Sequence, residues 1–124
     1  MGEKIKIQPI TIENFKPYGD ILDCSGSPDK LINNNFCERY DDKAVLDFQN
    51  GRAGISIFNA TPRDFPYECD MLERHPEGSQ AFIPMSENPF LIIVASNSIS
   101  EKPTNPLAFI TNPGQGINIH KNIW

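Results

Sequence analysis

Hydrophobic and polar positions alternate over short stretches of this chain, a pattern that predicts β-strands rather than helices. Alternation is visible at residues 5–9, and an extended run follows at residues 20–22. Two apolar runs, at residues 91–95 and 107–111, are too short for independent helices and favour buried strands. Residues 117–123 form the last predicted strand. The pattern therefore predicts many short strands around one core.

Turn residues separate these runs. Thr11 is placed to cap a single helical turn at residues 12–15. Residues 25–35 are rich in Ser, Gly, Pro, Asp and Asn and predict a surface loop. The pair at residues 50–51 is Asn-Gly, which tolerates the positive φ of a type I′ turn, so we expect a hairpin between strands at residues 45–48 and 54–59.

Eleven prolines and eight glycines leave little uninterrupted sequence for long helices. Short strands joined by tight turns predict a mainly all-β fold, either an antiparallel β-barrel or a double-sheet jelly roll, with one or two short helical turns. The length of 124 residues leaves room for one domain, spanning residues 1–124.

Composition narrows the function. A net charge of −5 with scattered lysines and arginines makes nucleic acid an improbable partner. The three cysteines are widely spaced and predict free thiols in a reducing compartment. The charged start has no signal-peptide core, and no apolar run approaches the roughly 20 residues that span a bilayer. We expect a cytoplasmic protein without a membrane segment.

Residues 72–84 carry the densest mixture of chemical groups, around a proline and a glycine. A residue before proline prefers an extended backbone, so Glu73 and His75 should point to one face and Arg74 to the other. Gln80 follows the turn, and we expect the turn to bring it beside Glu73 and His75. Carboxylate and imidazole together suit proton transfer, because burial and mutual charge can move their pKa values towards neutrality. The plainer interpretation is a surface acid beside a histidine bonded within a strand.

The second histidine, His120, shares a predicted strand face with Asn118 and Asn122, and Lys121 follows it. We predict that Glu73, His75 and His120 transfer protons. A three-ligand metal site from the same residues is an alternative, although the chain has only two histidines. The candidates for binding a polar substrate are Arg39, Arg74, Gln80, Asn118 and Lys121.

Four stretches resemble the ureidoglycolate lyase family, formerly called ureidoglycolate hydrolase. They are Phe-Lys-Pro-Tyr-Gly-Asp at residues 15–20, Glu-Arg-Tyr at 38–40, Leu-Glu-Arg-His-Pro-Glu-Gly-Ser-Gln-Ala-Phe-Ile-Pro at 72–84, and the pair of segments at 108–112 and 116–124. Their order and spacing match along the whole chain, and the run around His75 is highly specific.

The resemblance implies a cupin-like fold, a homodimer, and cleavage of ureidoglycolate into glyoxylate and urea during allantoin degradation, a part of purine metabolism. It implies that Arg39, Arg74 or Lys121 holds the substrate carboxylate. Nickel is associated with the family, but this sequence leaves the metal unknown.

Members of the family continue beyond the tryptophan that stands here at position 124, so we expect a domain that lacks the family's C-terminal strands. Two alternatives to an active lyase follow from this expectation and from the cupin resemblance. One is a catalytically impaired cupin-like remnant that binds a small molecule. The other is a cupin-type enzyme that acts on another small hydroxy acid.

Overall fold

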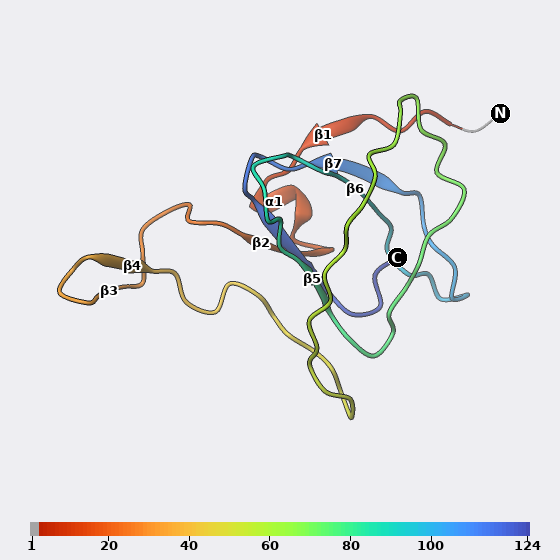
Figure 1. Cartoon of the computed structure of the whole chain (residues 1–124). Helices are drawn as coiled ribbons and strands as arrows, with labels where there is room; N and C mark the ends of the chain where they lie inside the picture. The colour runs from red at the N-terminus through yellow and green to blue at the C-terminus, as the bar shows by residue number, and fades with distance from the viewer. Residues whose placement is uncertain (1–2) are drawn as a thin grey trace.

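The computed structural model describes residues 3–124 and confirms a nearly all-β protein with the arrangement of a small cupin-like fold (Figure 1). The strands within this range are β1 (Ile7–Pro9), β2 (Gly19–Leu22), β3 (Lys30–Ile32), β4 (Cys37–Arg39), β5 (Gln80–Phe82), β6 (Leu91–Val94), β7 (Leu107–Ile110) and β8 (Gly116–Ile119). Helical structure is limited to α1 (Ile12–Phe15), and within residues 3–124 no helix is long enough to span a bilayer.

The strands form two three-stranded sheets, in the orders β1-β7-β6 and β2-β8-β5, and a separate ribbon of β3 and β4. All pairs are antiparallel, as predicted, except β1 with β7, which run parallel. The ribbon projects away from the two sheets (Figure 1). The sheet that contains β8 at its centre is the one that carries the candidate site.

The core lies between the two sheets. Phe15 from α1 and Phe109 from β7 are fully buried, and their rings meet edge to face with centroids 5.3 Å apart. Ile117 from β8 is buried in the same cluster. Successive side chains of a strand point to opposite faces, so Asn118 lies on the face of its sheet away from this core.

The predicted helical turn is confirmed. The Thr11 side chain accepts the backbone N–H of Asn14 at 3.0 Å, and the Asn14 side chain accepts the N–H of Thr11 at 2.8 Å. This reciprocal capping satisfies two backbone donors at the start of the turn. It holds Phe15 in the core, one residue after Asn14.

The predicted hairpin at Asn50 and Gly51 is wrong. A turn is present, with the N–H of Gly51 donated to the carbonyl of Phe48 at 2.8 Å, but neither residues 45–48 nor residues 54–59 form a strand. The reason is that backbone groups of the first segment form hydrogen bonds with side chains rather than with a second strand. The backbone N–H and the carbonyl of Val45 both bond to side chains of the β2-β8-β5 sheet. We call residues 44–48 the covering segment.

Two other predictions need smaller corrections. The loop predicted at residues 25–35 contains β3, because the left-handed backbone at Asn33, Asn34 and Asn35 reverses the chain into β4. The last strand ends at Ile119 rather than at residue 123, since Asn122 adopts a positive φ of 68°.

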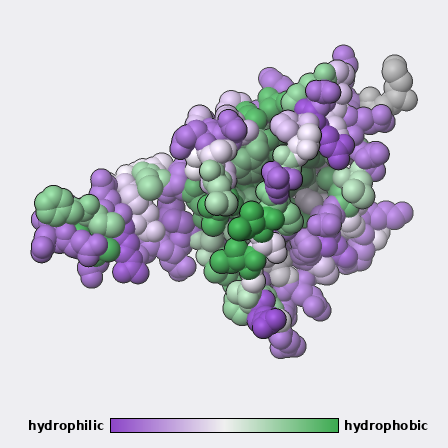
Figure 2. Space-filling model, viewed as in Figure 1, coloured by the Kyte–Doolittle hydropathy of each residue, from purple (hydrophilic) through white to green (hydrophobic). Residues whose placement is uncertain are grey.

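Large apolar side chains are exposed on the irregular part of the chain. Figure 2 shows apolar residues gathered on the face that this view presents. The most exposed apolar side chains within the described range include Phe36, Ile55, Ile57, Phe58, Met71, Met85 and Ile99. The core therefore takes up only part of the apolar surface that the sequence supplies.

Candidate active site

The end of β8 is the point where the candidate segments meet. Ile119, its last residue, pairs with Gly19 of β2 on one side and with Gln80 of β5 on the other. Just beyond the strand, the N–H of Asn122 is donated to the carbonyl of His75 at 2.8 Å. These pairings bring residues 72–80, residues 18–20 and His120 to one edge of the sheet.

Close packing at Gly19 makes this junction possible. A Cβ at this position would lie 2.1 Å from the carbonyl oxygen of Asn118 and 2.9 Å from the Phe15 ring. Only glycine lets β2 approach β8 this closely. The adjacent backbone N–H of His120 is donated to the carbonyl of Tyr18 at 2.9 Å, which fixes the position of the histidine.

Glu73 and His75 form the first acid–imidazole pair. Oε2 of Glu73 lies 3.1 Å from Nε2 of His75, in agreement with the predicted shared face. Both side chains are solvent-accessible, and His75 is 50% exposed. An open hollow of 450 Å³ adjoins them, lined by His75, Gln80 and the four residues between them. The pair is accessible to a small molecule.

His120 forms the second pair, with Asp20 of β2. Nε2 of His120 lies 3.0 Å from Oδ1 of Asp20. The ring is turned so that this contact falls outside good hydrogen-bond alignment, and the buried Nε2 has no other partner within residues 3–124. The His120 side chain is 32% exposed, so this second pair is more sheltered than the first.

Asp20 is held by two further donors. Its Oδ2 accepts the backbone N–H of Val45 at 2.7 Å and the side-chain amide of Asn118 at 3.0 Å. Burial alone would raise the pKa of Asp20, but these hydrogen bonds and the neighbouring His120 outweigh it and lower the pKa below its ordinary value. The carboxylate is therefore charged at neutral pH.

Asn118 lies beneath this pair rather than in an open site. It is fully buried, and its Nδ2 donates both to Asp20 and, at 2.8 Å, to the carbonyl of Val45 in the covering segment. Its Oδ1 is buried without a hydrogen-bond partner in the described part of the chain. Because Asn118 is inaccessible, it cannot reach a substrate as the protein stands; it holds Asp20 instead.

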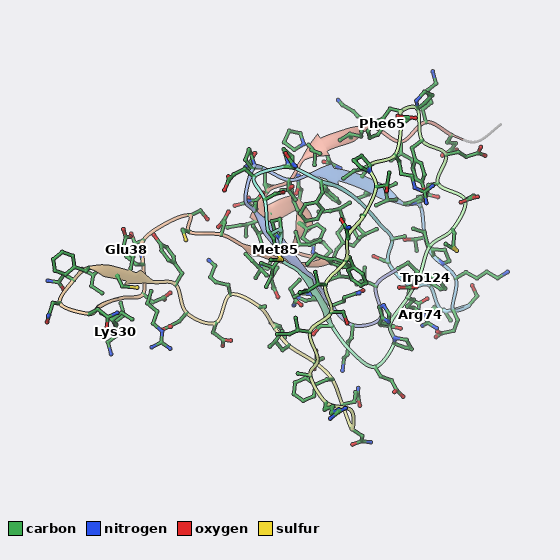
Figure 3. All side chains as sticks on the ribbon, in the orientation of Figure 1. Lys30, Glu38, Phe65, Arg74, Met85 and Trp124 are labelled. Atoms are coloured by element: carbon green, nitrogen blue, oxygen red, sulfur yellow. The ribbon has the colours of Figure 1, made fainter. Side chains whose placement is uncertain are left out.

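Arg74 points away from Glu73 and His75, as the alternation of side chains along an extended segment predicts, and its guanidinium contacts three other side chains. Its guanidinium pairs with Glu101, donates to Oδ1 of Asn122 at 2.7 Å, and stacks 5.1 Å from the centroid of the Trp124 ring (Figure 3). Hydrogen bonds from Asn97 and from Arg74 lower the pKa of Glu101. This cluster fastens the segment before Pro76 to the end of the chain.

The structure does not bring Arg39 to the other candidates. Arg39 lies in β4 of the projecting ribbon (Figure 1), where it pairs with Asp41. Lys121 directly follows His120, is exposed, and makes no ion pair within residues 3–124. Of the three candidate cations, Lys121 is the one beside the histidine pairs without a protein partner.

The residues present do not form a ready metal site. No three His, Cys, Asp or Glu side chains within residues 3–124 converge closely enough to hold an ion, so Glu73, His75 and His120 do not form the three-ligand set considered from the sequence. Each histidine instead has one carboxylate partner. We assign no step to a metal.

Sequence reasoning named His120 and missed its partner Asp20. A signal was present, because Asp20 precedes the apolar Ile21 in a predicted strand, where an acid on one face calls for a partner. The partner became evident only through the register that sets Asp20 opposite Asn118.

Comparison with known proteins agrees along the whole chain. The family model described as ureidoglycolate lyase matches residues 2–124. The ureidoglycolate lyase of Rhodobacter capsulatus is 50% identical over 123 residues, which cover 98% of this chain and 76% of the relative. That of Mesorhizobium japonicum is 46% identical over 98% of this chain and 75% of its own length, and that of Pseudomonas aeruginosa is 43% identical over 97% and 72%. The chain therefore belongs to the ureidoglycolate lyase family.

Proposed function

We propose that this chain is a carbon–nitrogen lyase that splits ureidoglycolate into glyoxylate and urea, as a step in allantoin degradation. The family membership supports the reaction. The structural observation that carries the proposal is that two carboxylate–imidazole pairs lie on segments that join at the end of β8, and that the first pair, Glu73 and His75, adjoins an open hollow of 450 Å³.

The reaction needs two proton movements. A base removes the proton from the carbinol hydroxyl, the carbon–nitrogen bond breaks as the carbonyl of glyoxylate forms, and an acid protonates the departing urea nitrogen. Imidazoles can perform both roles near neutral pH. The two histidines lie on segments that are joined by the hydrogen bond from the N–H of Asn122 to the carbonyl of His75, and they are the candidates for these two roles.

We assign the base to His120 and the acid to His75 with Glu73. His120 is more sheltered and faces the Asp20 carboxylate, so the positive charge that the imidazole gains as a base would lie beside an opposite charge. His75 is accessible and paired with an exposed carboxylate, so it can exchange its proton with solvent between turnovers. Gln80, which lines the hollow, is assigned to orienting the urea group, and Lys121 to holding the substrate carboxylate.

The direct test is incubation of the purified protein with ureidoglycolate, with glyoxylate and urea measured against spontaneous release. We expect His120→Ala, His75→Ala and Glu73→Gln to lower kcat, the histidine variants by about 10²-fold or more. Glu68→Gln is the matched control, because Glu68 is an exposed acid that does not line the hollow and makes no hydrogen bond or ion pair within the described residues. Release no faster than the spontaneous rate in the unaltered protein would reject the proposal.

We further propose that the protein acts as a single domain in a cytoplasmic homodimer. The family resemblance supports the dimer, and the exposed apolar side chains provide surface that a second copy can cover. Sedimentation equilibrium would test this: a mass near twice 13.9 kDa is expected, and a monomer at micromolar concentration would contradict it.

A further inference from the structure

We infer that Asp20 is a positioning residue for His120, which fixes the imidazole proton on Nε2 and leaves Nδ1 as the proton acceptor. This inference rests on the proposed lyase function and adds a residue to it. It follows from the different contacts that the two oxygens of the Asp20 carboxylate make.

The oxygens of Asp20 have different partners. Oδ2 accepts two hydrogen bonds, from the N–H of Val45 and from Nδ2 of Asn118. Oδ1 is left facing Nε2 of His120 at 3.0 Å. The first oxygen fixes the orientation of the carboxylate, because both of its donors come from groups that are themselves held in place. The second oxygen is thereby aimed at the histidine.

The Val45 and Asn118 donors support each other. Nδ2 of Asn118 donates to the carbonyl of Val45 as well as to Asp20, so the covering segment, β8 and β2 are joined through one amide. Asn118 is fully buried, which shields these bonds from water and strengthens them. A carboxylate held in this way does not need to reorganise when charge develops on the imidazole.

The geometry sets the histidine tautomer. An ionised carboxylate can only accept a hydrogen bond, so a hydrogen bond between Oδ1 of Asp20 and a neutral His120 requires the imidazole proton on Nε2. Nδ1 makes no hydrogen bond to the described residues and, unlike Nε2, is not buried. The contact between Oδ1 and Nε2 is poorly aligned, as is common for catalytic pairs before substrate binds, and a small ring rotation would align it.

An Asp20→Asn variant separates this role from a structural one. Its side-chain oxygen must remain in the Oδ2 position, because Val45 and Asn118 both donate there. The new NH₂ group therefore takes the Oδ1 position and donates to Nε2 of His120, which forces the proton to Nδ1. All hydrogen bonds that hold the fold are kept, while the acceptor presented by His120 is lost.

Two measurements test the inference, and the chain offers a matched control. We would record ¹⁵N imidazole spectra above the titration range, with His75→Gln identifying the signals of His120, and measure kcat and KM for ureidoglycolate. Asp23→Asn is the control, because Asp23 follows the same strand, accepts Gln115 Nε2 at 2.7 Å and also has a lowered pKa, but faces no histidine.

We expect the proton on Nε2 of His120 in the unaltered protein and on Nδ1 in Asp20→Asn, with kcat reduced about 10²-fold or more and KM within about twofold. Asp23→Asn should change neither. A proton on Nδ1 in the unaltered protein, or normal kcat in Asp20→Asn, would overturn the inference. If the unaltered protein does not cleave ureidoglycolate, the proposed function fails, but the spectra still decide the role of Asp20. If Asp20→Asn does not fold, the spectrum of the unaltered protein decides alone.

Discussion

Replacement of Gly19 by alanine tests how closely β2 must approach β8. The new Cβ would lie 2.1 Å from the carbonyl oxygen of Asn118, whereas ordinary contact begins near 3.4 Å. The strands must therefore separate by roughly 1 Å, because the nearest atom belongs to the backbone and cannot rotate away. The Phe15 ring, 2.9 Å from the same Cβ, blocks movement towards the core.

The magnitude follows from these contacts. Overpacking of a filled site costs about 1–3 kcal/mol, and the loss of a ladder hydrogen bond at the end of β8 adds about 1 kcal/mol. The lower entropy of the unfolded alanine chain offsets about 0.4–1 kcal/mol of this. We expect Gly19→Ala to lower the free energy of unfolding by about 2–3 kcal/mol. Activity should fall as well, since Asp20 moves with the strand.

Urea denaturation of Gly19→Ala and Gly54→Ala measures the effect. Gly54 is the matched control, because a Cβ there meets nothing within 4 Å and its φ is not positive. That variant should remain within about 0.5 kcal/mol of the unaltered protein or be slightly more stable. Equal stability of the two variants would refute the close approach of β2 to β8.

Three further predictions concern the core, the acid side of the stability curve and the Arg74 cluster. Phe109→Ala should cost about 3–5 kcal/mol in urea denaturation, because a fully buried ring is lost from between the sheets; a smaller effect than 1 kcal/mol would contradict the core described. The pKa of Asp20 is lower in the folded protein than its ordinary value of 3.8, so its stabilisation is present above that pH and is lost as the pH falls through the folded pKa. Asp20→Asn should therefore weaken the dependence of stability on pH in this acid window, and an unchanged curve would argue against the hydrogen bonds to this carboxylate. Arg74→Ala should cost about 1–2 kcal/mol and change the fluorescence of Trp124, the single tryptophan, whereas Arg63→Ala, which removes an exposed stacking contact on tyrosine, should leave that fluorescence unchanged.

Strand positions were predictable where apolar runs pack directly into the core. β6 and β7 are such runs, and burial of Val94 and Phe109 leaves little choice of conformation. The covering segment was not predictable, although Val45 and Phe48 have the composition of a strand. Its backbone groups form hydrogen bonds with side chains that are more than 20 residues away in the sequence. The β-propensity of the residues in the segment cannot predict such distant partners.

The candidate site was predictable to the extent that it is local. The shared face of Glu73 and His75 follows from the backbone preference before proline, and their contact agrees with it. The partner of His120 was not local, because Asp20 lies on β2 and His120 follows β8, and only the pairing of these two strands brings them together. Arg39 and Arg74 were candidates for substrate binding because they carry a positive charge. In the structure each is paired with an acidic side chain, and such pairing depends on tertiary contacts that the sequence pattern does not reveal.

The N–H of Val45 is hydrogen-bonded to the Asp20 carboxylate of the candidate site rather than to another strand, so this one amide can report on that site. Amide hydrogen exchange at Val45 requires the covering segment to release the Asp20 carboxylate. The protection of that one amide therefore measures how often the site opens in the absence of substrate. A ligand that closes the site should slow exchange there while leaving the fully exposed amides of the neighbouring irregular chain unaffected.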